Sequence, residues 1–369
     1  MSPHRLRIAF VIDDLGHGGA QRQLSTLVAA LAETVEPQVY CLSEITRPFA
    51  DTIRAAGVRV VTMRRSRGFD VRRLRSLTHE ISSGEVDVVH GFLDAANLYA
   101  YLAARRARTP CVLSLRNEVL RLGGFRGWCL RRALRRADWV VTNSRAGARF
   151  LTDSVLVDPG RTTVVPNAVA SHHIDSAPDL APPQPPVIGF VGRLVEQKQP
   201  DLLIDAYAIL LERVPDATLV LVGDGPQRQS LLDRIRRLGV ADGVTMTGAV
   251  DNVERYMREF SCLVLPSVFE GFPNVVMEAL SLGIPVVACP VGDLEDVVLE
   301  GRTGRLIRED TPTALAFLLS QVIEDEPLRR SAAEEGPALI RTQYSVAAAT
   351  DKLLAVYNGL TSTEPSPRP

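Results

Sequence analysis

The sequence predicts two α/β domains, each a mostly parallel sheet with helices on both faces. Short β-branched runs alternate with longer amphipathic stretches through both halves, as in parallel sheets whose strands are connected by helices. A proline-rich stretch separates the halves, and 369 residues are enough for two hydrophobic cores. The content of 46% hydrophobic and 23% charged residues is that of an ordinary globular protein.

Strands are expected where β-branched runs precede helical or loop residues. In the first half these runs are 7–12, 37–41, 59–63, 86–90, 111–115, 139–142 and 162–165. In the second half they are 187–191, 218–222, 244–247, 262–265, 285–288 and 304–307. Ligands bind at the carboxyl ends of parallel strands, and two facing sheets leave a cleft between them. The residues that follow these runs are therefore the candidates for chemistry.

The proline-rich stretch predicts a domain boundary. Five prolines between residues 177 and 186 exclude a continuing helix or a central strand there. The expected parts are a first domain over 1–181, a linker at 182–186, a second domain over 187–345 and a helix over 346–360. This helix either stays with the second domain or returns to pack on the first domain. The tail at 361–369 is rich in Ser, Thr and Pro, which predicts disorder.

Several classes of protein are excluded. No window reaches 18 consecutive apolar residues, so no transmembrane helix is expected, and the N-terminus lacks the cleavage site of a signal peptide. The five cysteines show no CxxC spacing, which predicts reduced thiols in a cytoplasmic protein. Nucleic acid is not an expected partner, because the sequence has no recognised nucleic-acid module and a pI of about 6.6.

The net charge of −1 conceals an uneven distribution. Residues 1–186 contain 25 arginines against 17 acidic residues, whereas residues 187–369 contain 17 basic against 26 acidic residues. The excess of arginine over lysine is typical of a GC-rich genome. The positive first half, however, predicts that this domain lies near something anionic.

A glycine-rich turn follows the first expected strand. Gly16, Gly18 and Gly19 precede a helix, and backbone N–H groups of such a turn can approach an anion with help from the helix dipole. A tight turn without a ligand is the alternative. A nicotinamide-binding loop is disfavoured because Gln21 occupies the place of its third glycine, and neither lysine of the chain lies in a Walker A pattern.

In the second half, the strand at 187–191 leads into Gly192, Arg193 and Lys198, one of only two lysines in the chain. A planar guanidinium and a compact ammonium at the end of a strand suit the two phosphates of a diphosphate. The alternative is a pair of solvated surface cations. The Gly/Pro turn at 223–226 predicts only a change of chain direction.

The most informative segment follows the strand at 262–265. A loop carries Glu270, and Asn274 is expected to cap a helix that ends at Gly283. Glu278 then lies about one turn into this helix. Two carboxylates with backbone N–H groups between them match the hydroxyls of a sugar and a ribose. Compensation of the helix dipole is the alternative for Glu278, but it does not explain Glu270.

In this order the motifs resemble those of the retaining glycosyltransferases of family 4, over about residues 7–345. The matching positions are Gly18, Gly19, Asn143, Ser144, 165–167, Gly192, Arg193, Lys198, 223–226, Glu270, Glu278 and 283–288. The resemblance implies the GT-B fold, which is two Rossmann-like doubly wound domains facing across a cleft. It implies transfer of a hexosyl or N-acetylhexosaminyl group from a nucleotide-diphosphate sugar, which we expect to be UDP-linked, with the anomeric configuration retained.

The resemblance also implies roles for individual residues. Arg193 and Lys198 would hold the diphosphate and stabilise the charge that develops as it leaves. Glu270 would contact the transferred sugar and Glu278 the ribose. The rest of the donor site would be the backbone of Gly271, Phe272, Pro273, Asn274 and Val275, with Gly18 and Gly19 from the other domain. No cofactor and no catalytic metal is expected, and the sequence contains no Asp-x-Asp triplet.

One departure from the family lies after the expected strand at 111–115. Many relatives carry a histidine where this sequence has Arg116. An arginine cannot act as a base, so Arg116 and the adjacent Asn117 are expected to bind the sugar, the acceptor or a phosphate. His90, at the end of the expected strand 86–90, is a further candidate for this region. A purely structural histidine is the alternative.

The acceptor is predicted from two basic clusters in the first half. Residues 121–139 combine six arginines with apolar and aromatic residues, as do amphipathic helices at anionic membrane surfaces. The second cluster is Arg64, Arg65, Arg67, Arg72, Arg73 and Arg75. A helix that packs on the sheet with solvated arginines is the alternative. We expect a saccharide or lipid-linked acceptor, a role in cell-envelope or exopolysaccharide synthesis, and a cytoplasmic protein that associates with the inner face of the membrane.

Two other functions fit the same pattern. A nucleotide-sugar epimerase shares the two-domain fold, but its chemistry needs acid and base groups at a sugar carbon, and the chain has only six histidines. A degenerate family member that binds a nucleotide without turnover is the second alternative. Arg116 favours it, whereas Arg193, Lys198, Glu270 and Glu278 oppose it.

Overall fold

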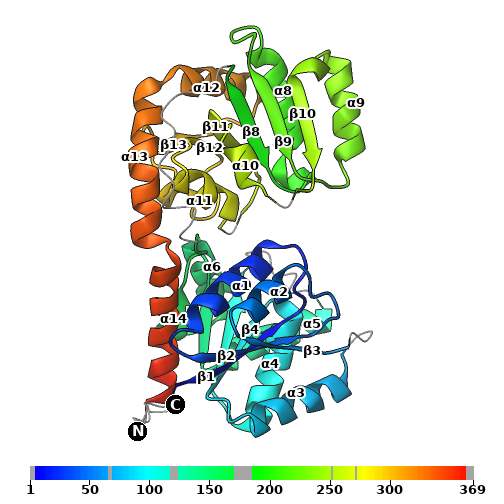
Figure 1. The fold of residues 1–369 in the computed structure, drawn as a ribbon, viewed down its shortest axis with the longest axis vertical. Helices are drawn as coiled ribbons and strands as arrows, with labels where there is room; N and C mark the ends of the chain where they lie inside the picture. The colour runs from blue at the N-terminus through cyan, green and yellow to red at the C-terminus, as the bar shows by residue number, and fades with distance from the viewer. Residues whose placement is uncertain are drawn as a thin grey trace. The chain divides into compact units, whose positions relative to one another are not determined.

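The computed structural model describes residues 5–64, 69–116, 124–169, 185–250, 252–270 and 272–362. The chain forms two compact units, Met1–Ala168 with Val346–Pro369, and Val169–Ser345. Figure 1 shows one sheet with its own helices in each unit. Most of the expected linker and the last seven residues of the expected tail lie outside the described residues.

The first unit contains a seven-stranded sheet in the order β3-β2-β1-β4-β5-β6-β7, and all neighbouring strands are parallel. The strands are β1 (Arg7–Ile12), β2 (Glu36–Cys41), β3 (Arg59–Thr62), β4 (Val88–Phe92), β5 (Cys111–Leu115), β6 (Trp139–Thr142) and β7 (Thr162–Val164). The order changes direction at β1, and ligands of doubly wound sheets bind beside such a point.

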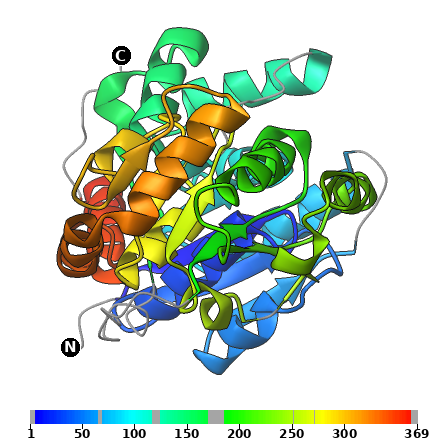
Figure 2. The ribbon, with the colours of Figure 1, turned by 90° about the horizontal axis from the view of Figure 1, so that it is seen from above.

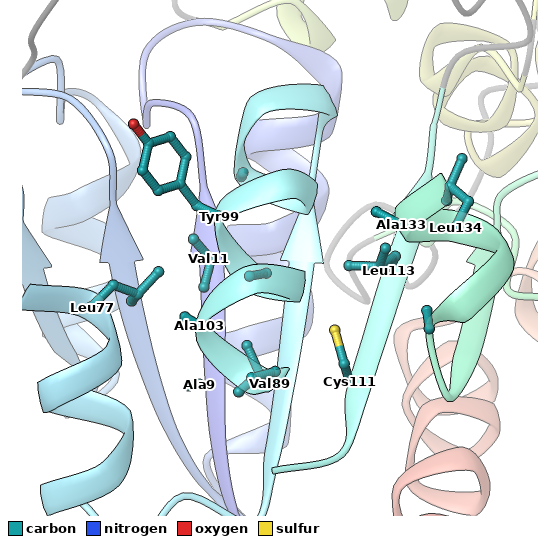
Figure 3. Packing of buried hydrophobic residues seen from close by; sticks show 14 of the residues in the cluster. Ala9, Val11, Leu77, Val89, Tyr99, Ala103, Cys111, Leu113, Ala133 and Leu134 are labelled. Carbon is teal, nitrogen blue, oxygen red and sulfur yellow. The ribbon is translucent and has the colours of Figure 1, made fainter. Parts of the chain in front are cut away.

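Helices cover both faces of this sheet because successive side chains of a strand point to opposite faces. The helices are α1 (Gly19–Leu31), α2 (Phe49–Ala55), α3 (Val71–Ser83), α4 (Asp94–Ala107), α5 (Gly124–Arg136), α6 (Arg145–Phe150) and α14 (Val346–Thr361). Ile8 and Phe10 pack in a core with α1, α2 and α14. Ala9 and Val11 pack in the opposite core with α3, α4 and α5, where Figure 3 shows them beside Leu77.

Strand β4 differs from the sequence prediction. We expected it at 86–90, with Gly91 beyond its end, but it runs from Val88 to Phe92. Gly91 belongs to the strand because α4 packs closely on it: a Cβ at this position would lie 2.6 Å from the Asn97 side-chain oxygen. The glycine is therefore a point of close helix–strand approach rather than a strand end.

The second unit contains a six-stranded parallel sheet in the order β10-β9-β8-β11-β12-β13. Its strands are β8 (Val187–Val191), β9 (Thr218–Val222), β10 (Val244–Gly248), β11 (Cys262–Leu265), β12 (Val286–Ala288) and β13 (Gly304–Leu306). Its helices are α8 (Pro200–Leu210), α9 (Arg228–Leu238), α10 (Glu254–Met257), α11 (Asn274–Ser281), α12 (Pro312–Glu324) and α13 (Glu326–Gln343). The expected fold class, two doubly wound α/β domains, is confirmed by the two parallel sheets.

These helices also form two layers. Side chains of α8, α9 and α12 fill one core and those of α11 fill the other, while α13 contributes Leu328 to the first and Ile340 to the second. Figure 2 shows α12 in orange and α8 in green on the same face. Local sequence signals define several helix starts: the Thr311 and Asp325 side chains accept hydrogen bonds from the first turns of α12 and α13. In the described part of the chain, no helix has the length and apolarity that crossing a bilayer would need.

Candidate functional site

Two loops interlock at the carboxyl edge of the second sheet. The loop after β8 and the loop after β9 are joined by backbone hydrogen bonds from Gly192 N to Val222 O and from Leu194 N to Asp224 O, both 3.0 Å. A Cβ at Gly225 would lie 2.4 Å from Leu194 O, so only glycine allows this approach. The turn that the sequence marked only as a change of direction thus holds the β8 loop in place.

Lys198 and Glu270 form the centre of this edge. Lys198 ends a short 3-10 helix (Glu196–Lys198), and its ammonium donates to a carboxylate oxygen of Glu270. Their side chains are only 15% and 10% exposed. A second tie holds the two loops together: Val268 N donates to Gln197 O at 2.9 Å, and Gln197 Nε2 donates to Phe269 O at 2.8 Å. The two candidate catalytic groups are therefore held in contact by the fold.

The other donor residues predicted in this unit differ in exposure. Arg193 is exposed, and its side chain has no hydrogen-bond or ion-pair partner among the residues that the structure describes. Glu278 lies one turn into α11 and is half-buried. Phe272 is 5% exposed and stacks on Tyr344, with ring centroids 5.3 Å apart, so its side chain belongs to the core. Gly271 lies outside the described residues.

The prediction that Asn274 caps the N-terminus of α11 was wrong by one residue. Asn274 is the first helical residue, and Pro273 occupies the capping position. The proline at that place fixes φ near the value that a helix entrance needs. The helix ends as expected: Gly283 has φ +74°, and Ile284 N donates back to Ala279 O at 3.0 Å.

In the first unit, the predicted glycine turn leads directly into α1. Gly18 precedes the helix and Gly19 begins it. Asp14 stabilises the turn, because its carboxylate accepts hydrogen bonds from Gly16 N at 2.9 Å and from Gln21 Nε2 at 3.1 Å. The Gln21 that weakened a nicotinamide interpretation is therefore part of the turn, because its side chain lies against Gly18.

The structure supports a structural role for His90 rather than the predicted contact with a ligand. Its ring is fully buried, and both nitrogens have partners: Nδ1 lies 2.6 Å from the Tyr357 hydroxyl and Nε2 lies 2.8 Å from Ser114 Oγ. Burial lowers the pKa of His90 well below its usual value, so the imidazole is neutral. The shift of β4 by two residues carried this side chain from the strand end into the core.

Arg116 follows β5 and is also buried, with 7% of its surface exposed. Its Nη1 donates to Asn167 Oδ1 at 3.0 Å, and the guanidinium carbon lies 4.7 Å from the centre of the Phe92 ring. Asn167 was expected only as part of a family motif, and the structure gives it a partner. Asn117 lies outside the described residues.

Sequence analysis gave no role to Asp13, the residue that directly follows β1. Its carboxylate accepts from Ala96 N at 2.6 Å, at the start of α4. Burial, with help from the nearby Asp94, raises the pKa of Asp13 to about 6. An acidic residue directly after a central strand was the signal that could have marked it.

The predicted basic helix is α5, and its two faces differ. Leu130, Ala133 and Leu134 pack in the core of the first unit, as the alternative interpretation expected. Phe125 and Trp128, by contrast, are 78% and 50% exposed and stack on each other with centroids 5.9 Å apart. Within the predicted cluster, Arg121 and its neighbour Leu122 lie outside the described residues, as do Arg65 and Arg67.

Comparison with known proteins identifies the family. Residues 17–172 match the family described as Glycosyltransferase Family 4, and residues 173–338 match Glycosyl transferases group 1. The chain is 31% identical over 304 residues to the D-inositol 3-phosphate glycosyltransferase of Stackebrandtia nassauensis, covering 74% of this chain and 68% of that protein. It is 29% identical over 231 residues to the lipopolysaccharide core biosynthesis mannosyltransferase LpsB of Rhizobium meliloti, covering 56% of this chain and 66% of that protein.

A solved structure shares the fold. The crystal structure of Anabaena HepE in complex with UDP superposes with a TM-score of 0.84 at 20% identity, covering 96% of this chain and all of that one. Together with the two parallel sheets, this likeness confirms the predicted GT-B fold. The family matches extend over both units and include the segments that carry Lys198 and Glu270. The chain therefore belongs to glycosyltransferase family 4 and is a glycosyltransferase.

Proposed function

We propose that the protein transfers a hexosyl or N-acetylhexosaminyl group from a UDP-linked sugar to a saccharide or lipid-linked acceptor, with retention of configuration and without a metal or other cofactor. The ion pair of Lys198 with Glu270 carries this proposal, because it holds a cation and a carboxylate together at the edge of the sheet where ligands bind. HepE was crystallised with UDP and with UDP-glucose, which supports the choice of nucleotide.

The chemistry needs a group that stabilises the leaving diphosphate. As the bond from the anomeric carbon to the diphosphate breaks and the bond to the acceptor oxygen forms, the departing diphosphate oxygen takes the electron pair of the broken bond, and the proton of the acceptor hydroxyl passes to the diphosphate. Arg193 and Lys198 would offset the negative charge that develops on the departing oxygen, in place of a metal ion. Glu270 would hold Lys198 in position and contact the transferred sugar, while Glu278 would bind the ribose.

The backbone completes the proposed donor site. The first turn of α11, from Asn274 to Val275, places backbone N–H groups at the positive end of the helix dipole. With Pro273 and the backbone of Phe272 and Gly271, these would line the sugar pocket. Gly18 and Gly19 would contribute N–H groups at the start of α1, where the helix dipole favours an anion.

Thermal unfolding against a panel of UDP, GDP, ADP, CMP and their sugar conjugates tests the donor site. A nucleotide at 100 times its dissociation constant should stabilise the wild type by about 2.7 kcal/mol. Lys198→Ala should lose most of this stabilisation, because the variant lacks the ammonium that faces the diphosphate.

The chain offers a matched control, since its only other lysine, Lys352, is exposed on α14. Lys352→Ala should respond to nucleotides as the wild type does. A wild type that none of the nucleotides stabilises, or a Lys198→Ala variant that is stabilised equally, would contradict the proposed donor site.

We further propose that the acceptor is used in cell-envelope or exopolysaccharide synthesis, on the cytoplasmic face of the membrane. The name of LpsB places that relative in lipopolysaccharide core biosynthesis, which supports this context. The exposed Phe125–Trp128 pair on α5 lies among arginines, and Arg132 lies 5.7 Å from the Trp128 ring. Aromatic rings surrounded by cations suit the headgroup level of an anionic bilayer.

Co-sedimentation with vesicles tests the membrane contact. Wild-type protein should bind vesicles that contain anionic lipid at low salt, and the binding should weaken as salt screens the arginines. The double variant Phe125→Ser/Trp128→Ser should bind at least about tenfold more weakly, because two exposed rings no longer reach the interface. Phe317→Ser, which removes a 49% exposed ring from the second unit, is the control. Failure of the wild type to bind would reject the membrane proposal.

A further inference from the structure

Among the residues that the structure describes, the buried cation of Arg116 has no counter-ion. Its Nε and Nη2 atoms are inaccessible and have no hydrogen-bond partner, and the described part of the chain supplies no carboxylate that pairs with it. Only Nη1 is satisfied, by Asn167. Buried polar groups are almost always hydrogen-bonded, and buried charges are almost always paired. Among the described residues, Arg73, Arg228 and Arg329 each have one such unpartnered atom, whereas Arg116 has two.

The neighbouring ionisable groups do not supply a negative charge. His90 is neutral because burial lowers its pKa, and burial raises the pKa of the Tyr357 phenol, which therefore stays protonated. Burial lowers the pKa of Arg116 itself only to about 10, so the guanidinium is a cation at neutral pH. No described neighbour therefore supplies the negative charge that would pair with the Arg116 guanidinium.

The two unpartnered atoms define the shape of that group. Nε–H and one Nη2–H are parallel on one edge of the planar guanidinium, and this edge matches two oxygens of a carboxylate or a phosphate. The orientation of the plane is fixed in advance, because Asn167 holds the opposite edge and Phe92 packs against one face. Such preorganisation is typical of a binding residue.

The position of Arg116 agrees with this chemistry. It follows β5 at the carboxyl edge of the first sheet, two strands from β1, where the strand order reverses. The same unit carries the excess of arginine over acidic residues. An anionic ligand would therefore be attracted to this unit, where the buried guanidinium of Arg116 lies at the edge of the sheet.

Resting on the proposed function, we propose that the acceptor of this glycosyltransferase is anionic, and that Arg116 binds its carboxylate or phosphate through the Nε–Nη2 edge. The arginine then selects acidic acceptors. A neutral sugar would leave the guanidinium unpaired, which is the kind of penalty that produces strong discrimination. Nη1 can stay on Asn167 while the anion binds the opposite edge, but the groups that shield Nε and Nη2 must move aside to admit it.

Three sugars that differ only at C6 test this proposal: glucose, glucuronate and glucose 6-phosphate. Binding of each to the full-length protein is measured by titration calorimetry at constant ionic strength, with inorganic phosphate as a fourth probe. We expect one of the two anionic sugars to bind at least about tenfold more tightly than glucose, as a bidentate, charge-assisted contact predicts. Preference for glucuronate identifies a carboxylate, preference for glucose 6-phosphate a phosphate, and equal binding of inorganic phosphate identifies an anion site without a sugar.

Two substitutions and a control separate binding from folding. Arg116→Met should abolish the preference for the anion, and Arg116→Lys should retain only part of it, because lysine keeps the charge but not the fork. Arg149→Met, which removes an exposed arginine on α6, should behave as the wild type. The unliganded Arg116→Met variant should melt no lower than the wild type, because it removes an uncompensated buried charge.

Two results would overturn the proposal. One is a wild type that binds glucose as tightly as both anionic sugars. The other is an Arg116→Met variant that keeps the preference or unfolds at a clearly lower temperature, which would make Arg116 a structural residue. UDP stabilisation of Arg116→Met reports separately on the proposed function, because Lys198 and Glu270 lie in the other unit. Loss of the anion preference with intact UDP stabilisation therefore tests Arg116 alone.

Discussion

Replacement of Glu270 by glutamine is expected to lower kcat/KM for the sugar nucleotide about 100-fold or more, the usual effect of removing one preorganised electrostatic group from an active site. The amide can still accept the Lys198 hydrogen bond, so the loop and the fold should persist. What it lacks is the negative charge that holds the ammonium beside the strand end and that, under the proposed function, would oppose the positive sugar carbon of the transition state. The loss should therefore appear in turnover, with a much smaller effect on unfolding.

The measurement is release of UDP from the sugar nucleotide that stabilises the wild type most. Glu335→Gln is the matched control, because Glu335 forms an ion pair with Arg302 in the same unit, but on the surface. Exposed pairs of this kind contribute little, so the control should keep wild-type turnover. A Glu270→Gln variant within twofold of the wild type would remove Glu270 from the catalytic set.

A double-mutant cycle shows whether Lys198 and Glu270 act as one unit. Their contact places them in a single electrostatic pair, so the effects of Lys198→Ala and Glu270→Ala should not add. The double variant should be about as inactive as the worse single variant. Full additivity would mean that each residue contacts the substrate independently, and the ion pair would then be a feature of the empty site.

Much of this architecture is encoded locally, and the sequence therefore predicted it. Parallel strands buried on both faces are continuous apolar runs, so their positions could be inferred without any contact information. The candidate donor site followed from the same logic, because Arg193, Lys198 and Glu270 come directly after strands of one sheet. Glu270 stood out because no local role, such as a helix cap, explained a carboxylate there.

What the sequence did not predict depends on contacts between distant residues. His90 was expected at a strand end because the expected strand stopped at residue 90, and only the packing of α4 on Gly91 shows that the strand continues. The partners of His90 are Ser114 and Tyr357, 24 and 267 residues away. Asn167 is likewise 51 residues from Arg116, and no local pattern connects them.

The turn at 223–226 shows the same limit most clearly. Locally, its glycines indicate only that the chain reverses. In the fold, Gly223 lies against the backbone of the β8 loop, with φ +135°, and its N–H donates to Gly248 O at 3.0 Å. The glycine thus joins the loop that carries the catalytic candidates to two neighbouring strands, and a single added methyl group there would clash with the backbone of that loop.

Gly223→Ala is expected to destabilise the second unit by about 4 kcal/mol or more, the range reached when strain and a steric clash coincide. A Cβ at this position would lie 2.0 Å from Gly192 O, a backbone atom that cannot move without breaking the hydrogen bond from Gly192 N to Val222 O. In addition, an L-residue rarely adopts φ +135°. Neither cost can be relieved by rotating a side chain.

Gly239→Ala separates the two costs. Gly239 also has a positive φ, +72°, at the end of α9, but a Cβ there would meet nothing within 4 Å. Its replacement should cost only about 1 kcal/mol, the strain of the left-handed backbone alone. Thermal unfolding of both variants should therefore place Gly223→Ala at least about 6 °C below Gly239→Ala, at about 2–4 °C for each kcal/mol in a unit of this size. Equal melting temperatures would show that the β8 loop can shift away from the added methyl group, and the interlocked loops would then not be what fixes Lys198.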